Sequence, residues 1–247
     1  MYVTYRYYKM NAKEILINSI YFSLFGAVIS FLFYDSVIAF FVIMLALPVF
    51  LKKKSNEIKS DKRNELKSEF CEMIGSISTS ISAGMSVENA FKESKIDMEK
   101  MYGQNAPIVM ELIEIERKLK LNVPMTECLK GFSENVQIED INDFVTVFTE
   151  AEKSGGNLKE IIKNTVSIIQ EKKRTEDEIE SMLKGKMLEQ KVISIIPFLI
   201  FIYLRLSSAE FISVLYHNPT GIAVMTVCLI VYVLSIGLSQ RIIDIRV

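Results

Sequence analysis

AEKSGGNL, residues 151–158, is the stretch that decides how the middle of this chain folds. Gly155 and Gly156 can adopt the backbone conformations that end a helix, and Asn157 is a favourable N-cap for the next one. Apolar residues then recur every three or four positions, which predicts one buried helix face: Leu158, Ile161, Ile162, Thr165, Ile168 and Ile169. The run becomes densely charged from Glu171 to Glu180 and apolar from Val192 onward. It therefore predicts a helix that leads from a water-soluble domain into a membrane.

The composition agrees with a chain of two kinds of segment. Of 247 residues, 50% are hydrophobic and 24% are charged, which is too apolar for an ordinary soluble domain and too charged for a protein wholly within lipid. The net charge of −1 argues against a nucleic-acid partner. Cys71, Cys128 and Cys228 show no metal-ligand spacing, so we expect three reduced thiols.

The N-terminal part predicts a hairpin of two membrane spans. Ile15–Leu51 is almost continuously apolar and too long for one span of about 20 residues, and Tyr34-Asp35-Ser36 breaks it near its middle. A cleaved signal peptide is the alternative, but the stretch is too long and no small-residue cleavage site ends it. Basic residues flank the pair on both sides: Arg6, Lys9, Lys13, Lys52, Lys53 and Lys54. The charge bias places both flanks in the cytoplasm and Asp35 outside.

The C-terminal part predicts a second hairpin. Its spans are Val192–Leu206, which contains Pro197, and Gly221–Leu238. Proline is tolerated inside a span because neighbouring helices can satisfy the freed carbonyl. Basic residues again flank the pair: Lys184, Lys186, Lys191, Arg241 and Arg246. We therefore predict an all-α cell-membrane protein with four spans, an N-terminal hairpin at 1–51, a domain at 52–190 and a C-terminal hairpin at 191–247, with both termini and the central domain cytoplasmic.

The central domain predicts an antiparallel bundle of about six helices. Turn formers, caps and prolines mark its helix boundaries at Ala83-Gly84, Ser86, Asn105-Ala106-Pro107, Pro124 and Asn157, and the fifth helix is expected over Ile138–Lys153. Three segments, Gly84–Phe91, Asn122–Leu129 and Gly155–Ile162, share a turn former, a cap or proline, an acidic first turn and an apolar pair. They form either an internal repeat or three ordinary helix starts.

The sequence offers no set of residues for catalysis, cofactor binding or metal binding. The single histidine, His217, lies in the predicted outer loop, so no histidine dyad forms within a chain. No phosphate-binding loop occurs, and Gly155-Gly156 lacks the preceding strand of a dinucleotide site. Asp35 and Asp244 raise the possibility of an intramembrane aspartyl enzyme, but the charge bias puts them on opposite faces of the bilayer, where they cannot share a proton. We expect no enzymatic activity.

The charged run before the third span has two interpretations. It is either a solvated helix held by pairs of opposite charge or a surface that contacts a cytoplasmic partner. Its position between bundle and bilayer favours the second. The candidate partner-contact residues are Glu152, Glu171, Lys172, Lys173, Arg174, Glu176, Asp177 and Glu178.

Three motifs carry a resemblance to a known family. Ser80–Ala90, Leu121–Met125 and Ala151–Leu158, in this order and with flanking spans, resemble the type II secretion F-domain family over roughly Leu66–Leu238. Two spans before a single F domain are most similar to members that assemble tight-adherence (Tad/Flp) pili. Asn122 stands where the family commonly has Gly, and a left-handed turn tolerates either.

The resemblance implies a non-enzymatic platform in the inner or cytoplasmic membrane. Its implied partners are a cytoplasmic secretion ATPase, pilin subunits, further copies or a paralogous platform subunit, and the lipid bilayer. Motion would need hinges, for which the candidate turn residues are Gly84, Ser86, Pro124, Gly155, Gly156 and Asn157. Plain helix stops are the alternative for these residues. The alternative function is a membrane-anchored sensor or scaffold with a helical partner-binding domain.

Overall fold

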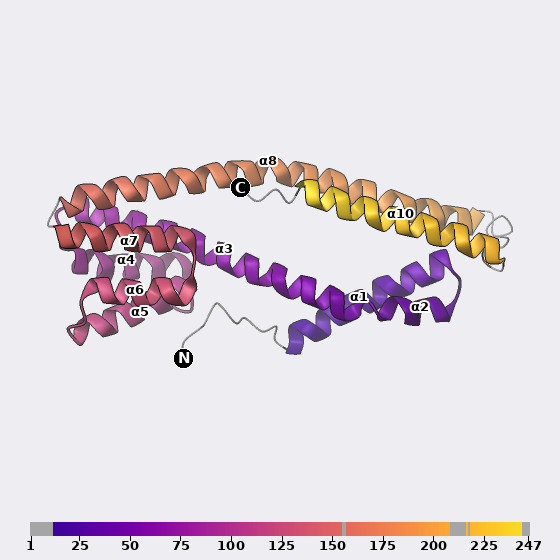
Figure 1. The fold of residues 1–247 in the computed structure, drawn as a ribbon, viewed down its shortest axis with the longest axis horizontal. Helices are drawn as coiled ribbons and strands as arrows, with labels where there is room; N and C mark the ends of the chain where they lie inside the picture. The colour runs from indigo at the N-terminus through magenta and orange to yellow at the C-terminus, as the bar shows by residue number, and fades with distance from the viewer. Residues whose placement is uncertain (1–11, 155–156, 208–215, 217, 244–247) are drawn as a thin grey trace. The chain divides into compact units, whose positions relative to one another are not determined.

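The computed structural model describes residues 12–154, 157–207, 216 and 218–243, and all regular secondary structure in these residues is α-helical (Figure 1). This confirms the predicted all-α class. The helices are α1 (Ala12–Phe33), α2 (Val37–Met44), α3 (Leu47–Ser82), α4 (Val87–Tyr102), α5 (Pro107–Lys120), α6 (Met125–Val136), α7 (Glu139–Ser154), α8 (Leu158–Ser207) and α10 (Pro219–Ile243).

Two predicted N-caps are confirmed. The Ser86 hydroxyl accepts a hydrogen bond from the Asn89 amide at 3.4 Å and begins α4. Asn157 accepts from the Glu160 amide at 3.4 Å through Oδ1, and its Nδ2 donates to the Glu160 carboxylate at 3.0 Å. Each cap gives an acceptor to an amide that has no partner within its helix.

The first two members of the set of three similar segments end the preceding helices in the same way. Gly84 and Asn122 both have a left-handed backbone, with φ of 97° and 60°. In each case the amide after this residue donates to a carbonyl five positions earlier, as in a Schellman motif. The two bonds, each 3.1 Å long, run from Met85 to Ser80 and from Val123 to Lys118. The third member's Gly155-Gly156 lies outside the described residues.

The described residues form two compact units. The bundle unit comprises those within 56–175, and the span unit comprises those within 12–55 and 176–243. The long helices α3 and α8 supply residues to both units, whereas α4 to α7 belong to the bundle unit.

The core of the bundle unit is built around α3. The ring centroid of Phe70 lies 5.7 Å from that of Phe144 on α7, in an edge-to-face arrangement, and 6.2 Å from that of Phe132 on α6. The largest fully buried side chains come from α3 to α7: Leu66, Phe70, Met73, Ile74, Ile77, Met98, Ile108, Leu112, Leu129, Ile141, Phe144 and Phe148. The start of α8 adds the buried Ile162 and Val166. Each helix therefore buries one apolar face in a shared core.

The span unit has a smaller aromatic core. Phe33 on α1 packs at 4.7 Å from Phe201 on α8, and Leu32, Tyr216 and Met225 are buried beside it. Large apolar side chains elsewhere on these helices are exposed, including Leu24 at 64% and Leu234 at 61%. Such outward apolar faces are expected where lipid is the surrounding medium.

Three described helices are long and apolar enough to cross a membrane: α1, α8 through its C-terminal part, and α10 over Pro219–Ser239. They correspond to the predicted first, third and fourth spans. The hairpin break is confirmed at Asp35, which has a left-handed φ of 45°, and Ser36 caps α2.

The predicted second span is divided between α2 and the start of α3. The chain turns at Leu45 and Ala46, whose amides donate to carbonyls three residues earlier. Pro48 follows at the second position of α3, and a proline ring there clashes with a helical carbonyl four residues back. The count of four spans stays a prediction.

Candidate functional site

Asp140, at the start of α7, joins three helices of the bundle unit through one ion network. Its carboxylate pairs with Lys172 on α8 at 2.6 Å and with Lys67 on α3 at 2.9 Å. The Asp140 side chain is only 5% exposed. Burial raises its pKa, but the hydrogen bonds from Lys172 and Lys67 outweigh burial, so the pKa lies below its ordinary value. The ionised carboxylate thereby fastens α8 to α3 and α7.

This network gives Lys172 an internal role. The residue is one of the predicted partner contacts, and its hydrogen bond to Asp140 raises its pKa. Its side chain stays 47% exposed, so its stem still lies on the surface. The rest of the charged run, 171–178, lies on α8 and is exposed or half-buried, and Glu152 is exposed near the end of α7. Partner contact by these residues stays a prediction.

The candidate hinge residues all occupy helix boundaries where they are described. Gly84 closes α3, Ser86 and Asn157 cap α4 and α8, and Pro124 precedes α6 with φ of −57°. These are the positions of helix stops and starts. Gly155 and Gly156 lie outside the described residues, and a hinge at any of these turns stays a prediction.

A buried acid that the sequence reading missed holds the start of α5. Glu69 on α3 is 3% exposed and accepts a hydrogen bond from the Ile108 amide at 3.0 Å. Burial raises the pKa of this carboxyl, and the bond to Ile108 partly opposes that rise. Pro107 at the first position of α5 has no amide hydrogen and Ala106 offers no side-chain cap, so Glu69 serves as the cap from another helix.

A second missed acid lies on α5 itself. Glu111 is half-buried, and burial raises the pKa of its carboxyl to about 7, against a smaller opposite effect of Lys118. Neither acid interrupts the apolar periodicity of its helix, so the sequence pattern does not indicate that either carboxyl is buried.

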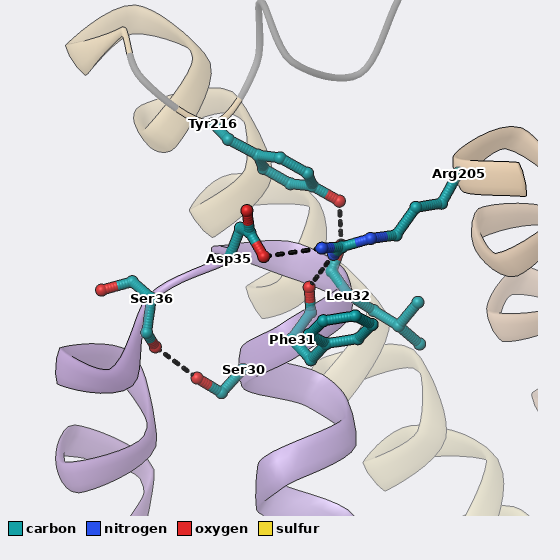
Figure 2. A network of polar contacts seen from close by, with 7 residues as sticks. All are labelled: Ser30, Phe31, Leu32, Asp35, Ser36, Arg205 and Tyr216. Carbon is teal, nitrogen blue, oxygen red and sulfur yellow. Dashed lines mark hydrogen bonds and ion pairs between the residues drawn. The ribbon is translucent and has the colours of Figure 1, made fainter. Parts of the chain in front are cut away.

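The span unit contains a polar network centred on Arg205 (Figure 2). The Arg205 guanidinium donates to the Asp35 carboxylate at 2.6 Å and also to the Phe31 carbonyl oxygen. Its central carbon lies 3.7 Å from the centroid of the Phe31 ring and 5.5 Å from that of Tyr216. Cation–π contact and ion pairing together offset the cost of placing a guanidinium at the end of an apolar helix.

Further hydrogen bonds fix the turn around Asp35. The Tyr216 hydroxyl donates to the Leu32 carbonyl at 2.5 Å, and the Ser30 hydroxyl donates to the Ser36 carbonyl at 2.5 Å (Figure 2). The network therefore joins the α1–α2 turn to the end of α8. Arg205 could have indicated this network from the sequence alone, because an arginine within an otherwise apolar span usually has a partner.

The Asp140 network and the Arg205 network both hold helices together. Within the part of the chain that the structure describes, no three histidine, cysteine or acidic side chains are grouped to hold a metal ion. Asp35 has Arg205 as its partner, while Asp244 and His217 lie outside the described residues.

One family model matches the chain, over residues 73–204, and its description is type II secretion system (T2SS), protein F. The match begins on α3, covers α4 to α7 and continues along α8 to the residue before Arg205. No curated protein and no solved structure matches the chain. The matched segment is more than half of the sequence, and the chain belongs to the type II secretion system protein F family.

Proposed function

We propose that this protein is the membrane platform of a Tad-type pilus machine and couples a cytoplasmic secretion ATPase to pilin extraction and filament assembly. Proteins of its family are membrane platform proteins. The observation that carries the proposal is the extent of the family match, because residues 73–204 include most of the bundle unit and a candidate span in α8. The matched segment thus combines most of the bundle unit with a candidate span.

The Tad assignment rests on the resemblance of the sequence to the family members that assemble tight-adherence (Tad/Flp) pili. One F segment follows an apolar hairpin, where other members of the family carry two F domains. Charge supports a cytoplasmic bundle, since Lys52, Lys53 and Lys54 follow the hairpin and Lys184, Lys186 and Lys191 precede the next span.

The proposed coupling runs along α8. Lys172 on this helix pairs with the buried Asp140, so a displacement of the bundle unit acts on α8. Arg205 at the other end of the helix pairs with Asp35 of the first hairpin. Force delivered by an ATPase to the bundle would pass along one helix to both sets of spans. Pilins held in the same bilayer are the proposed load.

Deletion of the gene tests this function. We expect surface pili to be lost while prepilin processing continues, because a platform acts after processing. Expression of the protein in trans should restore the pili. Normal piliation of the deletion strain would refute the proposal.

Copurification tests the ATPase contact. Glu171→Lys, Asp177→Lys and Glu178→Lys together reverse the three exposed acids of the charged run and leave the Lys172–Asp140 pair in place. The control reverses three exposed acids elsewhere on the bundle unit, Glu93→Lys, Glu127→Lys and Glu134→Lys. We expect the first variant alone to lose the ATPase from membrane extracts. Equal recovery with both variants would exclude this surface.

A further inference from the structure

Cations of the span unit gather at the end remote from Asp35. On α1, Lys13 lies 20 positions before Phe33, which corresponds to about 30 Å along a helix. On α8, Lys184 and Lys186 lie 17 and 15 positions before Phe201, or about 22–26 Å. Phe33 and Phe201 pack at 4.7 Å, so the three lysines lie at similar depths measured from the same ring pair.

The other two helices bring cations to this level. The Phe22 and Phe50 rings pack with their centroids 4.9 Å apart, and Lys52, Lys53 and Lys54 begin two positions after Phe50. On α10, the Tyr232 hydroxyl donates to the Ser194 carbonyl at 2.5 Å. Arg241 lies nine positions beyond Tyr232, or about 13 Å, which places it level with Lys184 and Lys186.

These residues form a basic collar, defined as Lys13, Lys52, Lys53, Lys54, Lys184, Lys186, Lys191 and Arg241. All are exposed except the half-buried Lys54. Lys191 lies about 15 Å before Phe201, and its long side chain, which leans toward the helix N-terminus, extends toward the level of Lys184 and Lys186. Lys184 pairs with Glu180 at 3.1 Å and Lys186 with Glu189 at 3.0 Å, each within one turn of α8 and with both partners exposed. Exposed pairs of this kind contribute little and exchange readily, so Lys184 and Lys186 can exchange these partners for an anionic headgroup.

The surface beside the collar is apolar. Val192 at 62%, Leu199 at 57% and Leu24 at 64% exposure lie between the collar and the Asp35 end. In a bilayer this apolar band takes the acyl chains, and the collar lies at the headgroup level about one hydrocarbon thickness from Asp35. Clustered lysines at that depth attract anionic headgroups and can bury their stems along the helix.

We propose that the basic collar is a binding site for the phosphate headgroups of anionic phospholipids. The lysine ammonium groups and the Arg241 guanidinium bind the phosphodiester oxygens, while the apolar band contacts the chains. A bound ring of such lipids holds the span unit at one depth in the bilayer. This resists axial slippage when force acts along α8.

The absence of tryptophan from the sequence permits a direct test. The full-length protein carries either Val192→Trp beside the collar or Val37→Trp beside Asp35, both at well-exposed positions. Each is reconstituted in phosphatidylcholine vesicles with brominated phosphatidylglycerol or brominated phosphatidylcholine as quencher. We expect phosphatidylglycerol to quench preferentially at Val192→Trp and the two lipids to quench equally at Val37→Trp. Equal quenching at both reporters would overturn the proposal.

Two further measurements identify the collar as the cause. Lys52→Gln, Lys53→Gln and Lys191→Gln together should lower the phosphatidylglycerol preference at Val192→Trp by at least fivefold, since one lysine at a membrane surface contributes roughly that factor. Lys92→Gln, Lys130→Gln and Lys163→Gln on the bundle unit are the matched control and should leave it unchanged. Raising the salt to 0.5 M should weaken the preference in the parent. A preference that survives the collar substitutions or the salt would contradict the site.

Discussion

Asp35 and Arg205 are 170 positions apart in the chain, yet their side chains meet at 2.6 Å. One belongs to the turn after α1 and the other to the last turn of α8. The pair is partly exposed, at 39% and 24% of each side chain. It is thus intermediate between surface pairs, which contribute little, and buried pairs, whose rupture is costly.

Breaking this pair should loosen the span unit without unfolding the bundle unit. We expect Asp35→Asn to lower the free energy of unfolding by about 1–2 kcal/mol, because Arg205 would keep its contacts with Phe31 but lose its counter-ion. Thermal unfolding of the full-length protein in lipid nanodiscs, followed by far-ultraviolet circular dichroism, measures the change.

The exchanged variant Asp35→Arg with Arg205→Asp is the control for the pair. Recovery of at least half of the loss would show that the two charges act on each other. If the exchanged variant is no more stable than the sum of the single changes, the ion pair does not hold α8 to α1.

Replacement of Asp140 should be more costly. Asp140→Asn leaves Lys67 and Lys172 without their carboxylate, and we expect a loss of about 3 kcal/mol. The lowered pKa of Asp140 means that its contribution is present above the unfolded-state pKa and is lost as the pH falls through the folded-state pKa. Asp143→Asn, an exposed change on the same helix, should have little effect at any pH. Equal losses for the two variants would contradict a special role for Asp140.

The cap on α5 predicts a local effect. Glu69→Ala removes the acceptor of the buried Ile108 amide, which should cost about 1–3 kcal/mol and speed hydrogen exchange at Ile108. Glu69→Gln keeps a carbonyl acceptor of the same length and should retain slow exchange there. Fast exchange in both variants would mean that the amide depends on the charge of Glu69 rather than on its position as an acceptor.

The sequence predicts the parts of this fold that depend on local chemistry. Ser86, Asn157 and the left-handed Asn122 were all identified from residue type and neighbours, because caps and turns are decided within a few residues. The three described candidate spans were equally visible, since hydropathy depends on composition alone. The division of the second span between α2 and α3 was not predicted, although Pro48 indicates it. Hydropathy averages over the apolar run and does not register the effect of one proline on the helix.

Long-range pairing could not be predicted in this way. Nothing local indicates that Asp140 meets Lys67 and Lys172, or that Glu69 caps a helix that begins nearly forty residues later. Lys172 shows the consequence most clearly. Within its charged run it resembled every other surface residue, and only the fold shows that its charge is already paired with a buried acid.

Glu111 predicts an unusual pH dependence. Its folded-state pKa of about 7 exceeds the ordinary value of 4.5, so the folded state binds the proton more tightly than the unfolded state. Its contribution to stability therefore falls as the pH rises from 4.5 to 7 and stays low above 7. Glu111→Gln should stabilise the protein at pH 8 by up to about 3 kcal/mol and have little effect at pH 4.5. Glu127→Gln, at an exposed site on α6, should show no such difference in urea unfolding at the two pH values.

Gly84 and Gly185 predict opposite effects of the same substitution. The backbone of Gly84 has a φ of 97°, which strains any residue with a side chain. Gly84→Ala should therefore destabilise the protein by about 1–2 kcal/mol. Gly185 lies inside α8 with open space around its Cβ position, and Gly185→Ala should stabilise it by up to about 1 kcal/mol. The level of surface pili in a strain with Gly84→Ala then distinguishes a helix stop from a hinge at Gly84. Loss of pili in proportion to the loss of folded protein indicates a stop, whereas loss of pili at an unchanged protein level indicates that the turn must move.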